Sequence, residues 1–77
     1  MKIKLGGYGI LKNYVGPPEN AREIELPQAK SLKDILQEMG IPDGMVMLIS
    51  VNDEQKNLDY VPQEGDEIKL VPPVSGG

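Results

Sequence analysis

The residue types with the clearest chemical use lie at the C-terminus, which reads Pro72-Pro73-Val74-Ser75-Gly76-Gly77. Proline has no backbone N–H to donate to a sheet and favours an extended polyproline conformation, so we expect Pro72 to end any strand and direct the chain outward. Fully extended, this segment would reach up to ~20 Å from a domain. Because glycine has no side chain, another protein can close tightly around the backbone of Gly76 and Gly77. The carboxylate of Gly77 is therefore a group on which another protein can act.

The rest of the chain offers little for catalysis. It has no histidine and no cysteine, the side chains on which acid–base and nucleophilic catalysis near neutral pH usually depend. Its carboxylates and lysines show no recognisable catalytic spacing, and the lack of cysteine excludes disulfides and thiolate metal sites. We therefore expect a protein that is acted upon, not an enzyme by itself, with no bound cofactor and no metal.

Charge and hydropathy narrow the class of partner. The formal net charge is −4, which disfavours binding to nucleic acid phosphates and suits a protein partner with a basic surface. The alternative is that mild acidity only keeps a small protein soluble. No apolar run approaches the ~20 residues that span a bilayer, and residues 1–5 alternate where a signal peptide would be continuously apolar. We expect a cytoplasmic protein with no membrane association.

Apolar alternation predicts the strands that position this tail. Residues 2–5 read Lys-Ile-Lys-Leu and residues 23–26 read Glu-Ile-Glu-Leu, each with the period of two that is typical of a half-buried strand. A final strand is expected over residues 67–70, and it leads straight into the tail. Residues 52–55 are expected to turn the chain, and residues 58–61 to form a short edge segment.

A helix is predicted after Ser31, which can cap its N-terminus. Apolar residues at positions i, i+3, i+4 and i+7 define one face, namely Leu32, Ile35, Leu36 and Met39. Gly40 stands where a left-handed C-cap is expected, and Pro42 blocks continuation. This apolar face is needed to cover the core.

Residues 45–51 form an apolar run broken only by Ser50, and we expect a central strand there. The face that alternation assigns to the core holds Met45, Met47, Ile49 and Val51. The other face holds Val46, Leu48 and Ser50, and it should point outward because a hydroxyl is easier to leave near water than to bury unpaired. Val46 and Leu48, joined by Val71, are then predicted to form an apolar docking patch. Alternatively, long Lys and Glu side chains shield this face.

Together these elements predict an α+β domain. The order is strand, strand, helix, strand, short segment, strand, which fits one mixed sheet of four to five strands with one main helix packed on one face. This is the β-grasp, or ubiquitin-like, fold. The chain of 77 residues is long enough for one domain, which we place at residues 1–71, with residues 72–77 as a projecting C-terminal tail.

The C-terminal segment resembles the small subunit of molybdopterin synthase, a family of sulfur carriers. The likeness rests on Gly65-Asp66-Glu67-Ile68 followed by Pro-Pro-Val-Ser-Gly-Gly, with weaker similarity at residues 11–16 and 51–52. The family is usually rich in phenylalanine in its first and last strands, whereas this chain has none. Gly6-Gly7 replaces bulkier residues, and Leu70-Val71 stands where aromatic residues are common. These departures leave the tail intact but put the identity of the partner in doubt.

The resemblance implies a specific chemistry for Gly77. Its carboxylate would be adenylated by a ubiquitin-activating-like adenylyltransferase that uses ATP, and sulfur from a persulfide donor would then replace AMP to give a thiocarboxylate. Residues 72–76 would occupy a channel in the large synthase subunit, which holds the pterin precursor and the catalytic residues. The sulfur would be used to form the dithiolene that ligates molybdenum or tungsten.

Two other functions remain open from the sequence. The chain could be a related carrier that supplies sulfur for thiazole or thiolated nucleosides, or a ubiquitin-like modifier that forms isopeptide bonds with lysines. It could also be a plain β-grasp binding module with an inert tail. The Pro-Pro-Val segment before Gly76 favours the molybdopterin pathway.

Overall fold

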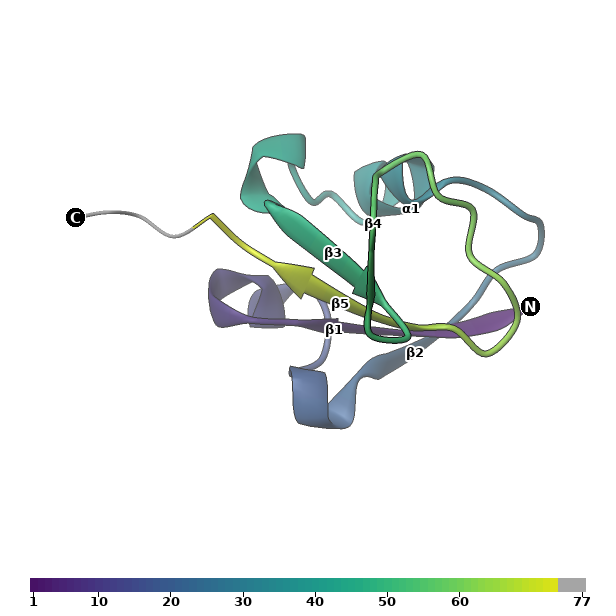
Figure 1. The fold of residues 1–77 in the computed structure, drawn as a ribbon, viewed down its shortest axis with the longest axis horizontal. Coiled ribbons are helices and arrows are strands. Elements are labelled where there is room, and N and C mark those ends of the chain that lie inside the picture. Colours follow the sequence, from purple (N-terminus) through teal and green to yellow (C-terminus); the bar gives the residue numbers. More distant parts are fainter. Residues whose placement is uncertain (74–77) are drawn as a thin grey trace.

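The computed structural model describes residues 1–73, which fold around a single sheet (Figure 1). The regular elements are β1 (Lys2–Gly7), β2 (Arg22–Glu25), α1 (Leu32–Glu38), β3 (Leu48–Val51), β4 (Glu54–Lys56) and β5 (Glu67–Val71). Short 3-10 helices occupy Gly9–Asn13, Pro18–Asn20 and Asp43–Met45.

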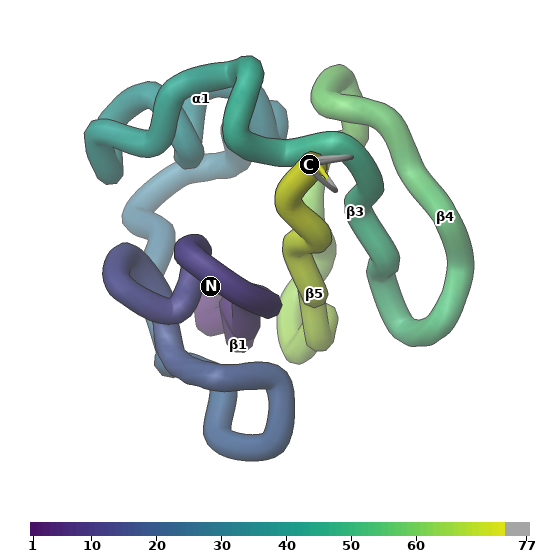
Figure 2. Tube along the Cα trace, turned by 90° about the vertical axis from the view of Figure 1, so that its left-hand side faces the viewer, coloured from purple at the N-terminus to yellow at the C-terminus, as the bar shows by residue number. Residues whose placement is uncertain are grey.

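The sheet has the strand order β2-β1-β5-β3-β4. The β1–β5 pair is parallel and the other neighbours are antiparallel, so the sheet is mixed. Figure 2 shows β5 between β1 and β3, with α1 to one side of them. One α-helix and a five-stranded mixed sheet confirm the predicted β-grasp fold.

Local signals in the sequence explain α1. The Ser31 hydroxyl accepts a hydrogen bond from the Asp34 backbone N–H at 3.2 Å, which satisfies one of the free donors of the first turn. Gly40 adopts a φ of +78° just beyond the helix, a conformation that favours glycine. The helix therefore begins and ends where the sequence predicts.

The core lies between α1 and one face of the sheet. Helix residues Leu32, Ile35 and Leu36 are buried. The other members of the buried hydrophobic cluster are Ile3, Leu5, Leu11, Val15, Leu26, Ile41, Ile49, Val51, Ile68 and Leu70. Along β5 the buried residues alternate with more exposed ones. The strand that leads to the tail is thus held in the centre of the sheet by both neighbours and by the core.

The predicted strand over residues 45–51 is partly wrong. Residues Asp43–Met45 form a 3-10 helix, and the strand begins only at Leu48. The turn changes the alternation, so that Val46 packs partly against the core while Met47 is 52% exposed. Val46 is thus half-buried, and it lines a hollow together with the more exposed Leu48. The central position in the sheet belongs to β5 and not to this strand.

The segment after β3 also differs from expectation. Asn52 and Asp53 both adopt positive φ, 51° and 70°, which gives the tight two-residue turn typical of a hairpin. Strand β4 therefore follows immediately, where a longer turn was predicted. Residues 58–61 do not form a strand, because the carbonyls of Leu58 and Tyr60 accept hydrogen bonds from the first amides of α1, at 2.9 and 2.8 Å. These amides have no partner within the helix.

Candidate functional site

The predicted tail leaves the domain at the end of β5. Val71 is the last residue of the strand, Pro72 is half-buried and Pro73 is exposed. Strand pairing thus stops at the first proline, as the chemistry of proline requires. The tail residues Val74, Ser75, Gly76 and Gly77 lie outside the described residues, and their assigned roles stay predictions.

Backbone hydrogen bonds from both sides hold the end of β5, where the tail begins. The Tyr8 N–H donates to the Leu70 carbonyl at 3.0 Å, and the Met47 N–H donates to the Val71 carbonyl at 2.7 Å. Tyr8 follows β1 and Met47 precedes β3. The last two residues of β5 are therefore hydrogen-bonded to the segments that flank both neighbouring strands. The domain therefore presents the start of its tail from a defined position, at the end of β5 opposite the N-terminus (Figure 1).

An apolar row crosses the outer face of the sheet next to this exit. Leu48 lies opposite Val71 in the β3–β5 register, and Leu48 is 40% exposed while Val71 is half-buried. On the other side of β5, Tyr8 is 44% exposed and lines a hollow with Val71, Pro72 and Pro73. We call Tyr8, Leu48, Val71, Pro72 and Pro73 the tail-base surface.

Sequence reasoning placed Leu48 and Val71 together but missed Tyr8. The register that brings Tyr8 beside Val71 depends on the parallel β1–β5 pairing, in which Gly7 is opposite Leu70. A long-range pairing of this kind has no local sequence signal. The one available hint was an aromatic residue among glycines directly after a strand, which could have been read as an exposed contact residue.

A polar cluster lies at the other end of β5. The Asp66 carboxylate, 5% exposed, accepts hydrogen bonds from Asn52 Nδ2, the Tyr60 hydroxyl and the Gln63 N–H, each at 2.8 Å. Burial by itself would raise the pKa of Asp66, but these hydrogen bonds outweigh it and hold the pKa below its ordinary value. The bond to Asp66 raises the pKa of Tyr60. The cluster joins the loops that precede β4 and β5.

This cluster has the features of a structural network. Asn52 also accepts a hydrogen bond from the Glu67 N–H at 3.0 Å through its side-chain oxygen, so its amide is used on both sides. Perturbed carboxylates often mark functional sites, yet all three partners of Asp66 come from the turns that it connects. We therefore assign Asp66 to the stability of the fold and not to the chemistry of the tail.

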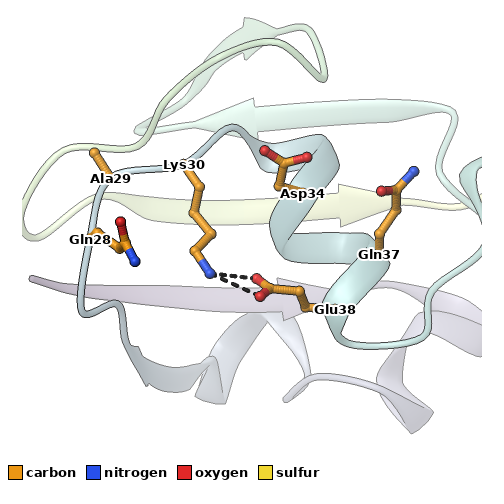
Figure 3. A pocket seen from close by; sticks show the side chains of 6 residues that line it. All are labelled: Gln28, Ala29, Lys30, Asp34, Gln37 and Glu38. Carbon is orange, nitrogen blue, oxygen red and sulfur yellow. Dashed lines mark hydrogen bonds and ion pairs between the residues drawn. The ribbon is translucent and has the colours of Figure 1, made fainter.

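A second hollow lies between α1 and the segment before it (Figure 3). Its lining residues are Gln28, Ala29, Lys30, Asp34, Gln37 and Glu38. Lys30 Nζ contacts both carboxylate oxygens of Glu38, at 2.7 and 2.9 Å, so the two charges that face each other are already paired. Within residues 1–73 no group of three or more Asp or Glu side chains is placed to hold a metal ion. No helix in this part of the chain is long and apolar enough to cross a bilayer.

Comparison with known protein families gives a match over residues 8–77 to the ThiS family. The chain belongs to the ThiS family. The match covers most of the domain together with the tail, and it supports the identification of the chain as a sulfur carrier with a β-grasp fold. A search of curated protein sequences found no match.

Solved structures resemble the chain over nearly its whole length. A chain in the complex of subunits 1 and 2 of molybdopterin-converting factor from Helicobacter pylori 26695 is 31% identical, with a TM-score of 0.56 and full coverage of both chains. A protein described as molybdopterin converting factor subunit 1 from Pyrococcus furiosus is 23% identical, with a TM-score of 0.68, and the match covers 96% of this chain and 99% of that one. Small archaeal modifier protein 1 from Haloferax volcanii is 17% identical, with a TM-score of 0.67 and coverage of 95% and 98%.

Proposed function

We propose that this ThiS-family protein carries sulfur as a C-terminal thiocarboxylate on Gly77 and serves as the small subunit of a molybdopterin synthase. The observation that carries the proposal is the 31% identity, over the full length of both chains, to a chain in the molybdopterin-converting factor complex from Helicobacter pylori. The tail-base surface supports it, since an apolar area beside the start of the tail suits a protein that docks while its terminus is processed.

The proposed chemistry proceeds in three steps at the Gly77 carboxyl group. An adenylating enzyme uses ATP to form the acyl adenylate and releases pyrophosphate, which gives the carboxyl carbon a good leaving group. The terminal sulfur of a persulfide donor attacks that carbon and AMP leaves. A thiol then cleaves the sulfur–sulfur bond by reduction and leaves the thiocarboxylate. In these steps the chain supplies the carboxyl group and a docking surface, and the partner enzymes supply the catalytic groups.

Delivery would follow when the large subunit binds the loaded tail. The large subunit holds the pterin precursor, and the thiocarboxylate sulfur attacks it in forming the dithiolene. The small subunit returns with a free carboxylate and can be loaded again. The two terminal glycines suit this use, because Gly76 and Gly77 allow a narrow channel to close around the backbone.

The proposal is tested by loading the protein with the adenylating enzyme, ATP and a persulfide donor. Intact mass spectrometry should show replacement of one oxygen by sulfur. Oxidation of methionine changes the nominal mass by the same amount, so the product is also treated with iodoacetamide, which alkylates a thiocarboxylate and not a sulfoxide. The matched control is deletion of Gly77, which moves the reacting carboxyl group by up to ~3.5 Å, well beyond the ~1 Å that already harms a reacting geometry.

The result decides between carrier and inert module. An alkylated product in the wild-type protein and none after deletion of Gly77 supports the proposal. Equal loading of both proteins would overturn the tail mechanism, and no loading with any adenylating enzyme would leave a plain binding module. Co-purification of the large subunit then separates the molybdopterin pathway from other sulfur-carrier pathways.

Conjugation to lysine is the second candidate function. The likeness to small archaeal modifier protein 1, at 17% identity, shows the fold alone, so it ranks below the synthase function. The two differ in product: a modifier would form an isopeptide bond between Gly77 and a lysine of another protein. Mass spectrometry of a tagged chain recovered from its own host would reveal such branched peptides.

A further inference from the structure

The turn that follows β1 lies directly against the first residue of the tail. Gly9 adopts a φ of +55°, and a Cβ atom at this position would lie 3.2 Å from Pro72 Cγ. A contact this short is tighter than most Cβ atoms make, so a side chain at position 9 would push against the proline ring. The half-buried Pro72 ring therefore lies beside a position that only glycine leaves open.

Positive φ alone does not account for Gly9. Gly40 and Gly65 have similar φ angles, +78° and +82°, but a Cβ atom at either position would meet nothing within 4 Å. Their glycines are explained by backbone conformation only. Among the glycines with positive φ in residues 1–73, Gly9 is thus distinguished by a neighbour, and that neighbour is Pro72.

The backbone around Gly9 is anchored, whereas Pro72 lies beyond the last residue of β5. The 3-10 helix Gly9–Asn13 lies at the end of the sheet where β5 ends (Figure 1), and its Leu11 side chain is fully buried in the core. The Tyr8 N–H, one residue earlier, donates to the Leu70 carbonyl at 3.0 Å. A side chain added in this turn would therefore displace Pro72 before it displaced the turn.

The two prolines make the start of the tail stiff. Val71 precedes Pro72, and Pro72 precedes Pro73. A residue before proline is restricted to extended conformations, and the φ angle of each proline is fixed by its ring. The orientation of the Pro72 ring therefore determines the direction of the chain at Pro73. Gly77 follows four residues later, at a distance of up to ~14 Å, so a small displacement of Pro72 would redirect the segment that carries the reacting carboxyl group.

We propose that Gly9 is a positioning residue for the Gly77 carboxyl group. By leaving room for the Pro72 ring, it sets the direction in which the tail leaves the domain and is presented to the adenylating enzyme. The inference rests on the proposed function and adds a residue that acts through Pro72 without touching the reacting atoms. A tail whose direction is set in advance loses less conformational entropy when it enters an active site.

The first test measures the direction of the tail in the free protein and needs no enzyme. The chain has no cysteine, so Ser75→Cys gives a single attachment point for a nitroxide label. The label broadens the NMR signals of nearby amides in the domain, and the pattern records where the tail points. Gly9→Ala should change this pattern. Gly40→Ala is the matched control, because it combines a similar positive φ with no neighbour, and it should leave the pattern unchanged.

The second test measures kcat/KM of the adenylating enzyme for the chain with its own Ser75, from the release of pyrophosphate. Gly9→Ala should lower kcat/KM about fivefold or more, since a misplacement of about 1 Å already harms a reacting geometry. Gly40→Ala should react like the wild-type protein at a temperature where urea denaturation shows both to be folded. Gly9→Asn repeats the test with a residue that tolerates positive φ better, so the result stands even if Gly9→Ala folds poorly.

A double variant separates an effect through Pro72 from a loss of stability. Pro72→Ala removes the Cγ atom that a side chain at position 9 would meet, while Pro73 still keeps the preceding residue extended. In this background Gly9→Ala should lower kcat/KM no further, because the two changes act on one contact. The cost of positive φ would be the same in both backgrounds. An equal loss of kcat/KM in both would therefore overturn the action through Pro72.

The outcomes separate this inference from the proposed function. Adenylation of the wild-type chain with an unchanged label pattern or an unchanged kcat/KM for Gly9→Ala would overturn the positioning role and leave the carrier function standing. Failure of the wild-type chain to be adenylated would overturn the proposed function, and with it the role of Gly9 in the reaction. A changed label pattern together with slower adenylation of Gly9→Ala, both absent from Gly40→Ala, supports the proposal.

Discussion

Leu48 of β3 and Val71 of β5 lie opposite each other on the outer face of the sheet, one residue before the first proline of the tail. The pair links the docking surface to the tail by geometry: Val71 belongs to the row of apolar side chains and also ends the strand that carries Gly77. A protein that covers Leu48 and Val71 is therefore positioned to receive the tail.

Leu48→Asp is predicted to weaken binding to the large subunit or to the adenylating enzyme about tenfold or more, because it places a charge at the centre of an apolar contact. Since Leu48 is 40% exposed, the free energy of unfolding should fall by about 1 kcal/mol or less. Calorimetric binding and urea denaturation measure the two effects. Gln55→Asp is the control, since it adds the same charge to the exposed strand β4, opposite Ser50.

Unfolding of the Leu48→Asp variant would contradict this prediction. If Leu48→Asp unfolded the domain without a separate binding defect, the side chain would contribute to packing and not to docking. Ile49→Asp provides the comparison, because Ile49 is 4% exposed and an unpaired buried charge is strongly destabilising. Only a clear difference in stability between the two variants supports the assignment of the faces.

Asp66 predicts how stability depends on pH. Its folded pKa lies below its ordinary value of 3.8, so its contribution is fully present above that value and is lost as pH falls through the lower folded pKa. Asp66→Asn should cost about 1–3 kcal/mol near neutral pH, because an amide N–H₂ group then faces one of the donors that met a carboxylate. Urea denaturation at neutral and acid pH measures this cost.

The gap between wild type and Asp66→Asn should shrink in acid, where Asp66 is protonated in both states. The other carboxylates titrate in both proteins and largely cancel in the comparison. Tyr60→Phe removes one of the three hydrogen bonds to Asp66 and should reduce the pH dependence only partly. A constant gap between wild type and Asp66→Asn at all pH values would show that the network adds no charge-dependent stability.

Met47 is predicted to make docking sensitive to oxidation. It is 52% exposed, whereas Met39 and Met45 pack against the core, and its N–H is bonded to the Val71 carbonyl. A peroxide should therefore oxidise Met47 first, forming the sulfoxide with release of water, and the polar sulfoxide should weaken binding beside the tail base. Peptide mass mapping locates the oxygen. Met47→Leu should bind normally before peroxide and keep its affinity afterwards; equal loss in both proteins would contradict the prediction.

The parts of the fold that the sequence predicted well depend on neighbouring residues. Ser31, Gly40 and the apolar spacing between them specify α1, and the two prolines end β5 without help from the rest of the chain. The errors arise where contacts with segments distant in the sequence determine the local structure. Residues 58–61 lack strand pairing because the Leu58 and Tyr60 carbonyls bond to α1, and no local pattern indicates such a partner.

In the candidate site, too, the residues predicted correctly depend on local sequence, and the one that was missed depends on long-range pairing. Val71 and Leu48 followed from alternation, because both lie within regular strands. Met47, which alternation assigned to the core, is exposed because a 3-10 turn interrupts the alternation before β3. Tyr8 was missed because it becomes part of the site only through the parallel pairing of β1 with β5. Alternation therefore predicts which face a strand residue occupies, but not where the strand begins or what lies beside it.

Gly76→Ile tests whether the tail works in a narrow channel. A β-branched side chain would clash with a partner that closes around the backbone, and it would also restrict the conformations open to glycine. Thiocarboxylate formation, measured by intact mass and alkylation, should be blocked.

Val74→Ile is the matched control, because it enlarges a side chain that is already β-branched and should be loaded. Melting temperature should hardly change in either variant, because the tail is predicted to project from the domain and would then contribute little packing. A large drop for Gly76→Ile would mean that position 76 packs onto the domain, and the same loading rate as the wild type would mean that no narrow channel surrounds it.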